Sequence, residues 1–167
     1  GEPVYYRCTD GLAHDMLYVQ GSASMPIVSR PVETDGMKLL DGGISDSIPL
    51  KYFESIGYER NIVILTQPRY YQKSVQKGLP VMKAALKQYP EIYRDMERRH
   101  EMYNETLEYI REREAQGNVL VLCPDEALGI GRISHDRDEL RRVYLIGRET
   151  AVRRLDEIRS FLNESGK

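Results

Sequence analysis

A continuous apolar run with polar ends governs the fold predicted for this chain: Asn61-Ile62-Val63-Ile64-Leu65-Thr66. Runs of this kind are typical of central parallel strands that are covered on both faces. A second apolar run, over residues 119–123, ends before Pro124 and is predicted to be another buried strand. Residues with helical spacing separate the two runs, so strands and helices alternate. The sequence therefore predicts an α/β layered domain with a mainly parallel sheet.

The stretch before the first run combines short apolar segments with glycine and proline. Pro26 ends a predicted helix, because the residue before a proline disfavours the helical region. Asp35-Gly36 between alternating residues is a strong hairpin signal, and Pro49 suits the first turn of a helix that Gly57 ends. The elements predicted here are a strand at 4–8, a helix over 12–23, a short strand at 27–28, a hairpin over 32–40 and a helix over 49–56.

The stretch after residue 73 is helical and rich in charged residues. Apolar residues spaced by three, four or seven predict one helix that Pro90 interrupts and a longer one that Gly117 ends. Another apolar stripe, over residues 140–162, predicts a helix or a helix pair. Gly147 lies on this stripe, which indicates close backbone packing at that position.

Composition excludes some classes of function. A chain of 167 residues, of which 41% are hydrophobic, can bury the core of one domain. A formal net charge of −2 and a pI near 6 offer no clustered basic face, so no nucleic-acid partner is expected. No apolar run approaches the ~18–20 residues that span a bilayer, and residues 3–8 are too few and too polar for a signal peptide. We expect a cytoplasmic or peripheral membrane location rather than secretion.

Metal and disulfide chemistry have little support in the sequence. Cys8 and Cys123 lie far apart, without Cys-x-x-Cys spacing, and are expected to be reduced thiols. The three histidines, His14, His100 and His135, show no metal-like spacing. We therefore expect no metal site and no cofactor.

The tripeptide Asp41-Gly42-Gly43 is the candidate for chemistry. Its carboxylate follows a predicted strand, and catalytic carboxylates in α/β folds tend to lie at the carboxyl ends of strands. The two glycines allow a close backbone approach that residues with side chains do not. The same tripeptide is also ordinary turn chemistry, in which the carboxylate binds its own backbone. The tripeptide alone leaves both interpretations open.

The wider context of Asp41 resembles the back half of the patatin-like phospholipase family. The matching features are a small-residue stretch that ends in proline at 22–26, a short strand pair, the Asp-Gly-Gly signature, Pro49, and an apolar strand at 61–66. The helical tail from residue 74 resembles the C-terminal extension of one bacterial branch of that family.

This resemblance implies a three-layer α/β/α fold with a mainly parallel sheet and a helical C-terminal extension. Residues 1–73 would be the C-terminal part of the catalytic domain. Residues 74–167 would form the extension, with one further strand at about 118–123, packed on the same domain.

The resemblance also implies a serine–aspartate dyad that hydrolyses a lipid or another acyl ester. Asp41 would be the base, and Gly42 and Gly43 would let its strand end approach the serine. The sequence contains no Gly-x-Ser-x-Gly motif and no glycine-rich oxyanion loop. The nearest match, at 43–47, ends in serine and follows Asp41, so Ser45 is not taken as the nucleophile. The chain by itself is expected to be inactive, and the missing N-terminal part of the same domain is its expected partner.

Other interpretations remain open from the residues. The chain could be a non-catalytic α/β domain whose helical tail binds a protein, with Asp41 a turn residue only. Tyr70-Tyr71 are candidates to line an acyl site or an interface. Arg98-Arg99 belong to a stretch of mixed charge, which indicates a solvated helix face. An incomplete sheet would expose an edge and apolar surface, so we also expect self-association.

Overall fold

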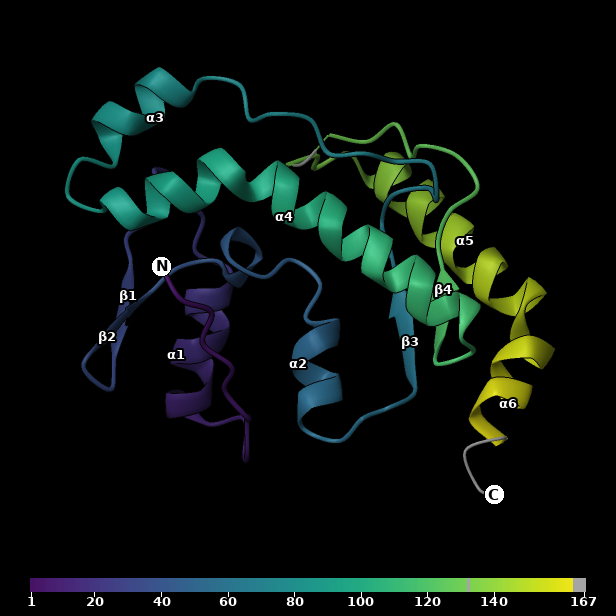
Figure 1. Cartoon of the computed structure of the whole chain (residues 1–167). Helices are drawn as coiled ribbons and strands as arrows, with labels where there is room; N and C mark the ends of the chain where they lie inside the picture. Colours follow the sequence, from purple (N-terminus) through teal and green to yellow (C-terminus); the bar gives the residue numbers. More distant parts are fainter. Residues whose placement is uncertain (132, 164–167) are drawn as a thin grey trace. The chain divides into compact units, whose positions relative to one another are not determined.

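The computed structural model describes residues 1–131 and 133–163 and is mainly helical (Figure 1). Helices hold about 48% of the described residues and strands about 9%. The strands form two separate two-stranded sheets. Strand β1 (Val32–Thr34) pairs antiparallel with β2 (Met37–Leu39), and β3 (Asn61–Ile64) pairs parallel with β4 (Val119–Leu122). The prediction of a three-layer α/β/α fold around a mainly parallel sheet is therefore wrong.

The parallel pair shows why that prediction failed. All four residues of β4 are buried, but Ile64 of β3 is 75% exposed. An apolar run forms a central strand only where other strands flank it and helices cover both faces. In the described part of the chain β3 pairs with β4 alone. The two strands were predicted correctly, whereas the large sheet around them was not.

The helices follow the predicted periodicity closely. A short 3-10 helix, η1 (Gly42–Ile44), was not predicted. The α-helices are α1 (Ala13–Ser22), α2 (Leu50–Ser55), α3 (Leu79–Ala85), α4 (Pro90–Ala115), α5 (Arg137–Arg153) and α6 (Leu155–Asn163). The strands predicted at 4–8 and 27–28 are wrong. Neither segment finds a partner strand, and residues 26–28 form a turn in which Ile27 has φ 72°.

The predicted hairpin is confirmed at the turn that its sequence favours. Asp35 and Gly36 both adopt left-handed backbone angles, with φ 49° and 74°. This is the conformation that a two-residue hairpin turn requires, and Asp-Gly adopts it readily. The hairpin β1–β2 lies against α1 (Figure 1).

The described chain divides into two compact units, each with its own buried residues. The first unit comprises Gly1–Pro49 and Lys73–Thr106, and the second comprises Leu50–Gln72 and Leu107–Lys167. Each unit therefore draws segments from both predicted ranges, 1–73 and 74–167.

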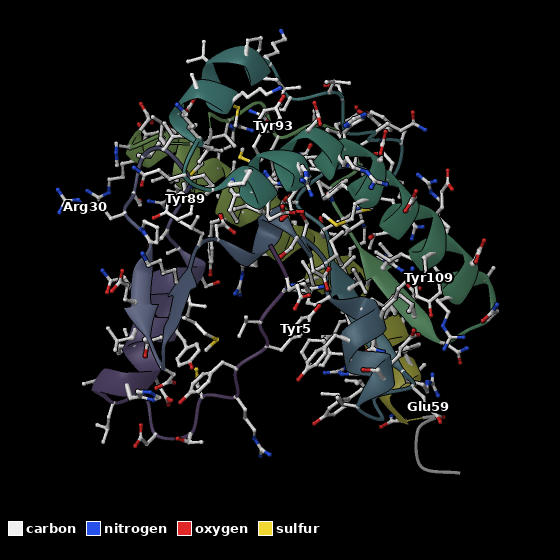
Figure 2. All side chains as sticks on the ribbon, turned by 60° about the vertical axis from the view of Figure 1, so that its left-hand side comes forward. Tyr5, Arg30, Glu59, Tyr89, Tyr93 and Tyr109 are labelled. Carbon is white, nitrogen blue, oxygen red and sulfur yellow. The ribbon has the colours of Figure 1, made fainter. Side chains whose placement is uncertain are left out.

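The core of the first unit joins the stretch after β2 to α3 and the start of α4. Its buried residues are Ile44, Met82, Leu86 and Met96. Tyr93, labelled in Figure 2, packs against this core, and the Nζ atom of Lys83 lies 5.6 Å from the centre of its ring. The second unit buries all of β4 together with Leu107 and Ile110 of α4.

The apolar stripe of the last two helices is only partly covered by the described residues. Neither α5 nor α6 contains a buried residue, and Tyr144 and Leu162 are both more than half exposed. The prediction of a helix pair is confirmed, but the close packing predicted at Gly147 is wrong, because a Cβ atom there would meet nothing within 4 Å. Of the described helices, none is both long enough and apolar enough to cross a membrane.

Candidate functional site

Asp41 begins the short helix η1 and organises the turn that follows it. Its Oδ1 atom accepts a hydrogen bond of 2.8 Å from the N–H of Gly43, and its carbonyl accepts one of 3.2 Å from Ile44. Ile44 is buried in the core of the first unit, which anchors the far end of the turn. The structure thus places the three predicted site residues, Asp41, Gly42 and Gly43, in one tight turn.

Space at this turn explains one of the two glycines. A Cβ atom on Gly43 would lie 3.1 Å from Oδ1 of Asp41 and 3.3 Å from Nη2 of Arg99. A Cβ atom on Gly42 would meet nothing within 4 Å. Gly43 is therefore the position where the absence of a side chain allows the close approach.

The turn is tied to the segment that precedes the hairpin. The N–H of Asp41 donates a hydrogen bond of 2.8 Å to the carbonyl of Ser24. Ser24 is only 6% exposed, and its hydroxyl donates to the carbonyl of Gln20 at the end of α1. The two stretches that the resemblance names, 22–26 and 41–43, are thus in direct contact.

A residue of α4 also binds the turn. Arg99 donates from Nε to the carbonyl of Gly43 across 2.7 Å, and the Ser47 hydroxyl donates to the same oxygen across 2.6 Å. The interpretation of Arg98-Arg99 as a solvated face holds for Arg98, whose side chain is 78% exposed beside Glu101. It is wrong for Arg99, which is half-buried.

The helical spacing of Arg99 from apolar residues could have predicted that its side chain faces the core. Arg99 follows Ile92 by seven residues and Met96 by three, and both of those residues pack in the core of the first unit. Residues at these spacings share one helix face. A charged side chain that is half-buried needs a polar partner, and here the partner of Arg99 is the Gly43 carbonyl.

The two oxygens of the Asp41 carboxylate differ in their hydrogen bonds. Its side chain is half-buried, and one oxygen is occupied by the N–H of Gly43. Within residues 1–131 and 133–163, no hydrogen bond reaches the other oxygen. A carboxylate held on one side and open on the other can take a proton from a hydroxyl group placed beside it.

The loop also holds a second carboxylate with a different environment. Asp46 accepts a hydrogen bond from the hydroxyl of Tyr5, which Figure 2 labels. This contact joins the N-terminal segment to the loop that follows η1. The side chain of Asp46 therefore has a partner from a distant segment of the chain, whereas the side chain of Asp41 is bound only by its own turn.

A polar cluster near the hairpin was not predicted. Asp15 of α1 is 2% exposed and accepts hydrogen bonds of 2.7–2.9 Å from the hydroxyl of Tyr6 and the backbone N–H groups of residues 9, 10 and 11. The bond from Tyr6, followed by the backbone bonds, holds the pKa of Asp15 well below its ordinary value. The same bond raises the pKa of Tyr6 to about 12.

The rest of this cluster ties α1 to the hairpin turn. His14 lies 3.1 Å from both carboxylate oxygens of Asp35, and Tyr18 donates its hydroxyl to the same group. The bonds from Tyr18 and His14 lower the pKa of Asp35. The ring of Tyr6 stacks on Tyr18 with centroids 3.5 Å apart. Every carboxylate here is engaged, so the cluster fastens residues 6–18 to the hairpin.

Tyr70, a candidate for an acyl site or an interface, and its neighbour Arg69 both bind glutamates of the second unit. Tyr70 donates its hydroxyl to Glu126 and is 63% exposed. The neighbouring Arg69 binds both oxygens of Glu114, at 2.5 and 2.7 Å. This bond is the main cause of the lowered pKa of Glu114.

No metal centre is formed by the side chains that the structure describes. No group of three or more His, Cys, Asp and Glu residues within that part of the chain is placed to hold an ion. Cys8 and Cys123 are free thiols, the first exposed and the second half-buried.

Comparison with known proteins finds one similarity. A family model described as a domain of unknown function (DUF6363) matches residues 89–163. No curated protein and no solved structure matches the chain. Arg99 lies inside the matched segment, and Asp41 lies outside it.

Proposed function

We propose that this chain supplies the aspartate of a serine–aspartate dyad in a patatin-like acyl hydrolase, acting on a lipid or another acyl ester. The observation that supports this function is the geometry of Asp41. One carboxylate oxygen is held by Gly43, and the other has no hydrogen-bond partner among the described residues. The contact between Asp41 and Ser24 adds support, because it joins the two stretches on which the family resemblance rests.

In this proposal Asp41 takes the proton of the serine hydroxyl. A serine hydroxyl is a weak nucleophile until a base within hydrogen-bond reach accepts its proton. The open oxygen of Asp41 is the acceptor, while the N–H of Gly43 keeps the carboxylate from rotating. Donors of an oxyanion hole then stabilise the charge on the substrate carbonyl.

In this proposal the serine and the oxyanion loop are supplied by residues outside these 167, which contain neither motif. The chain alone is therefore expected to be inactive. A complete site would form when the serine-bearing segment, the missing N-terminal part of the domain, lies beside the Asp41 turn. No metal or cofactor takes part in this mechanism.

The test uses the complete gene product that carries these residues. Turnover of a chromogenic fatty-acyl ester and labelling by a fluorophosphonate are measured for wild type, Asp41→Asn and Asp46→Asn. Loss of a general base lowers turnover by about 10²- to 10⁴-fold, so Asp41→Asn should fall in that range. Asp46→Asn is the matched control, because Asp46 is on the same loop and binds Tyr5. Near-normal turnover in a folded Asp41→Asn protein contradicts the proposal.

A second candidate function is a non-catalytic domain that binds a protein through its helical tail. The exposed apolar residues of α5 and α6 favour it, because contiguous apolar surface often marks an interaction site. The complete gene product would then show neither fluorophosphonate labelling nor esterase turnover, and Asp41→Asn would leave partner binding unchanged.

A further inference from the structure

We propose that Arg99 of α4 is a positioning residue for Asp41, a role that rests on the proposed function of that carboxylate. The guanidinium group of Arg99 holds the carbonyl of Gly43. In this way it sets the direction in which the Asp41 side chain faces, although it touches neither the substrate nor the serine.

Both backbone groups of Gly43 form hydrogen bonds. Its N–H donates to the Asp41 carboxylate, and its carbonyl accepts from Arg99 and from Ser47. Glycine has the widest backbone freedom of any residue, so a carboxylate aligned by a glycine N–H is aligned only as well as that glycine is restrained. Arg99 and Ser47 supply that restraint from the carbonyl side.

The two restraints on the Gly43 carbonyl come from different parts of the chain. Ser47 lies four residues from Gly43, on the same loop, and can move with it. Arg99 is 56 residues away in sequence and belongs to a helix face that carries Ile92 and Met96 into the core. The bond from Arg99 therefore connects the turn to the packed interior of the first unit, whereas the bond from Ser47 does not.

The charged groups of Arg99 and Asp41 both lie beside Gly43. Nη2 of Arg99 and Oδ1 of Asp41 lie within 3.3 and 3.1 Å of the same point, the place where a Cβ atom on Gly43 would stand. The guanidinium group and the carboxylate therefore both face the open side of Gly43, although no ion pair joins them among the described residues. Arg99 acts on Asp41 through the Gly43 backbone and not through a direct charge contact.

This role connects the Asp41 turn to the segment that the family model matches. Arg99 lies within residues 89–163, which the family model matches, while Asp41 lies in the segment that resembles the patatin-like family. The N-terminal half of α4 would then help to position the catalytic aspartate.

The experiment compares Arg99→Met, Arg99→Lys and Arg98→Met in the complete gene product. A misplacement of about 1 Å at a catalytic group can lower the rate by about 100-fold. We expect kcat of Arg99→Met to fall by about 10- to 100-fold with KM nearly unchanged. In Arg99→Ala, whose truncated side chain leaves a gap, millimolar guanidinium should restore part of the turnover. Arg98→Met, whose parent side chain is exposed, should behave as wild type.

A second readout does not depend on activity. In the 167-residue chain, amide hydrogen exchange over residues 40–47 should be faster in Arg99→Met than in wild type or Arg98→Met. If Arg99→Met does not fold, Arg99→Lys decides the question: the lysine keeps the charge, but its donor lies at another position along the side chain than Nε, so the bond to the Gly43 carbonyl is misplaced and turnover should still fall. Wild-type turnover and exchange in a folded Arg99 variant overturn the positioning role while Asp41→Asn remains inactive. Full turnover in Asp41→Asn instead overturns the proposed function itself.

Discussion

The backbone N–H of Asp41 and the carbonyl oxygen of Ser24 are joined by a hydrogen bond of 2.8 Å. The bond closes a loop around the hairpin β1–β2, because Ser24 precedes β1 and Asp41 follows β2. Ser24 is buried just after the end of α1, so its hydrogen bond holds the start of the Asp-Gly-Gly turn against α1. Beyond Asp41 the turn continues through Gly42, which has open space around it, and Gly43, which is closely surrounded.

The two glycines of the turn should respond differently to alanine. Gly43→Ala places a Cβ atom 3.1 Å from Asp41 Oδ1 and 3.3 Å from Arg99 Nη2, so one of these groups must move. We expect esterase turnover of the complete gene product to fall about 10-fold or more. Gly42→Ala has open space and should keep turnover near that of wild type. Equal turnover in the two variants would show that the close approach at Gly43 has no role.

Asp15 should make stability depend on pH in acid. Its pKa is lowered in the folded state, mainly by the hydroxyl of Tyr6 and the backbone N–H groups of residues 9–11. A lowered pKa stabilises the fold above the unfolded value of about 4, and this stabilisation is lost as the pH falls below it. Urea unfolding of wild type and Asp15→Asn between pH 2 and pH 7 should give free energies that differ at neutral pH and converge in acid.

The matched control for Asp15 is an exposed carboxylate. Asp156 of α6 has a side chain that is 99% exposed and lies 3.5 Å from Arg159. Exposed pairs contribute little to stability. Asp156→Asn should therefore leave the free energy of unfolding nearly unchanged at every pH. If Asp15→Asn also shows no difference at pH 7, the network around Asp15 does not stabilise the fold.

Self-association should follow from the uncovered apolar surface. Ile64 of β3 is 75% exposed, and α5 and α6 contain no buried residue. Sedimentation equilibrium of the chain should give an apparent mass that rises with concentration. Replacing exposed apolar residues with charge, as in Tyr144→Glu with Leu155→Glu, should weaken the association. Arg148→Glu introduces negative charge on α5 without removing apolar surface and should not. A single monomer at high concentration in wild type would contradict this expectation.

Local features of the fold could be predicted because they depend on neighbouring residues. The Asp35-Gly36 turn, the end of α2 before Gly57 and the strand at 61–64 are all set by backbone preferences within a few residues. The helix pair α5–α6 was likewise visible in the spacing of its apolar residues. The candidate Asp41 was found in the same way, from the turn chemistry and the order of the motifs around it.

The sheet, the partner of Arg99 and the burial of Asp15 were decided by tertiary structure alone. The apolar run at 61–64 predicts a strand with buried faces. It does not show how many other strands pair beside it or whether helices cover it. Arg99 lies in a highly charged stretch that is typical of a solvated helix face. Only the packing of α4 brings it to the carbonyl of Gly43. Asp15 looks like an ordinary first-turn residue of α1 until Tyr6 and the loop at 9–11 fold over it.

For this protein, then, the amino-acid sequence by itself determined where most helices and turns begin and end, and which carboxylate stands at a glycine pair. Tertiary structure decided what restrains that carboxylate. The reason is physical: a turn depends on the φ and ψ angles of a few adjacent residues. The hydrogen bond from Arg99 to Gly43 joins residues 56 positions apart, so it forms only once the core of Ile44, Met96 and their neighbours has packed.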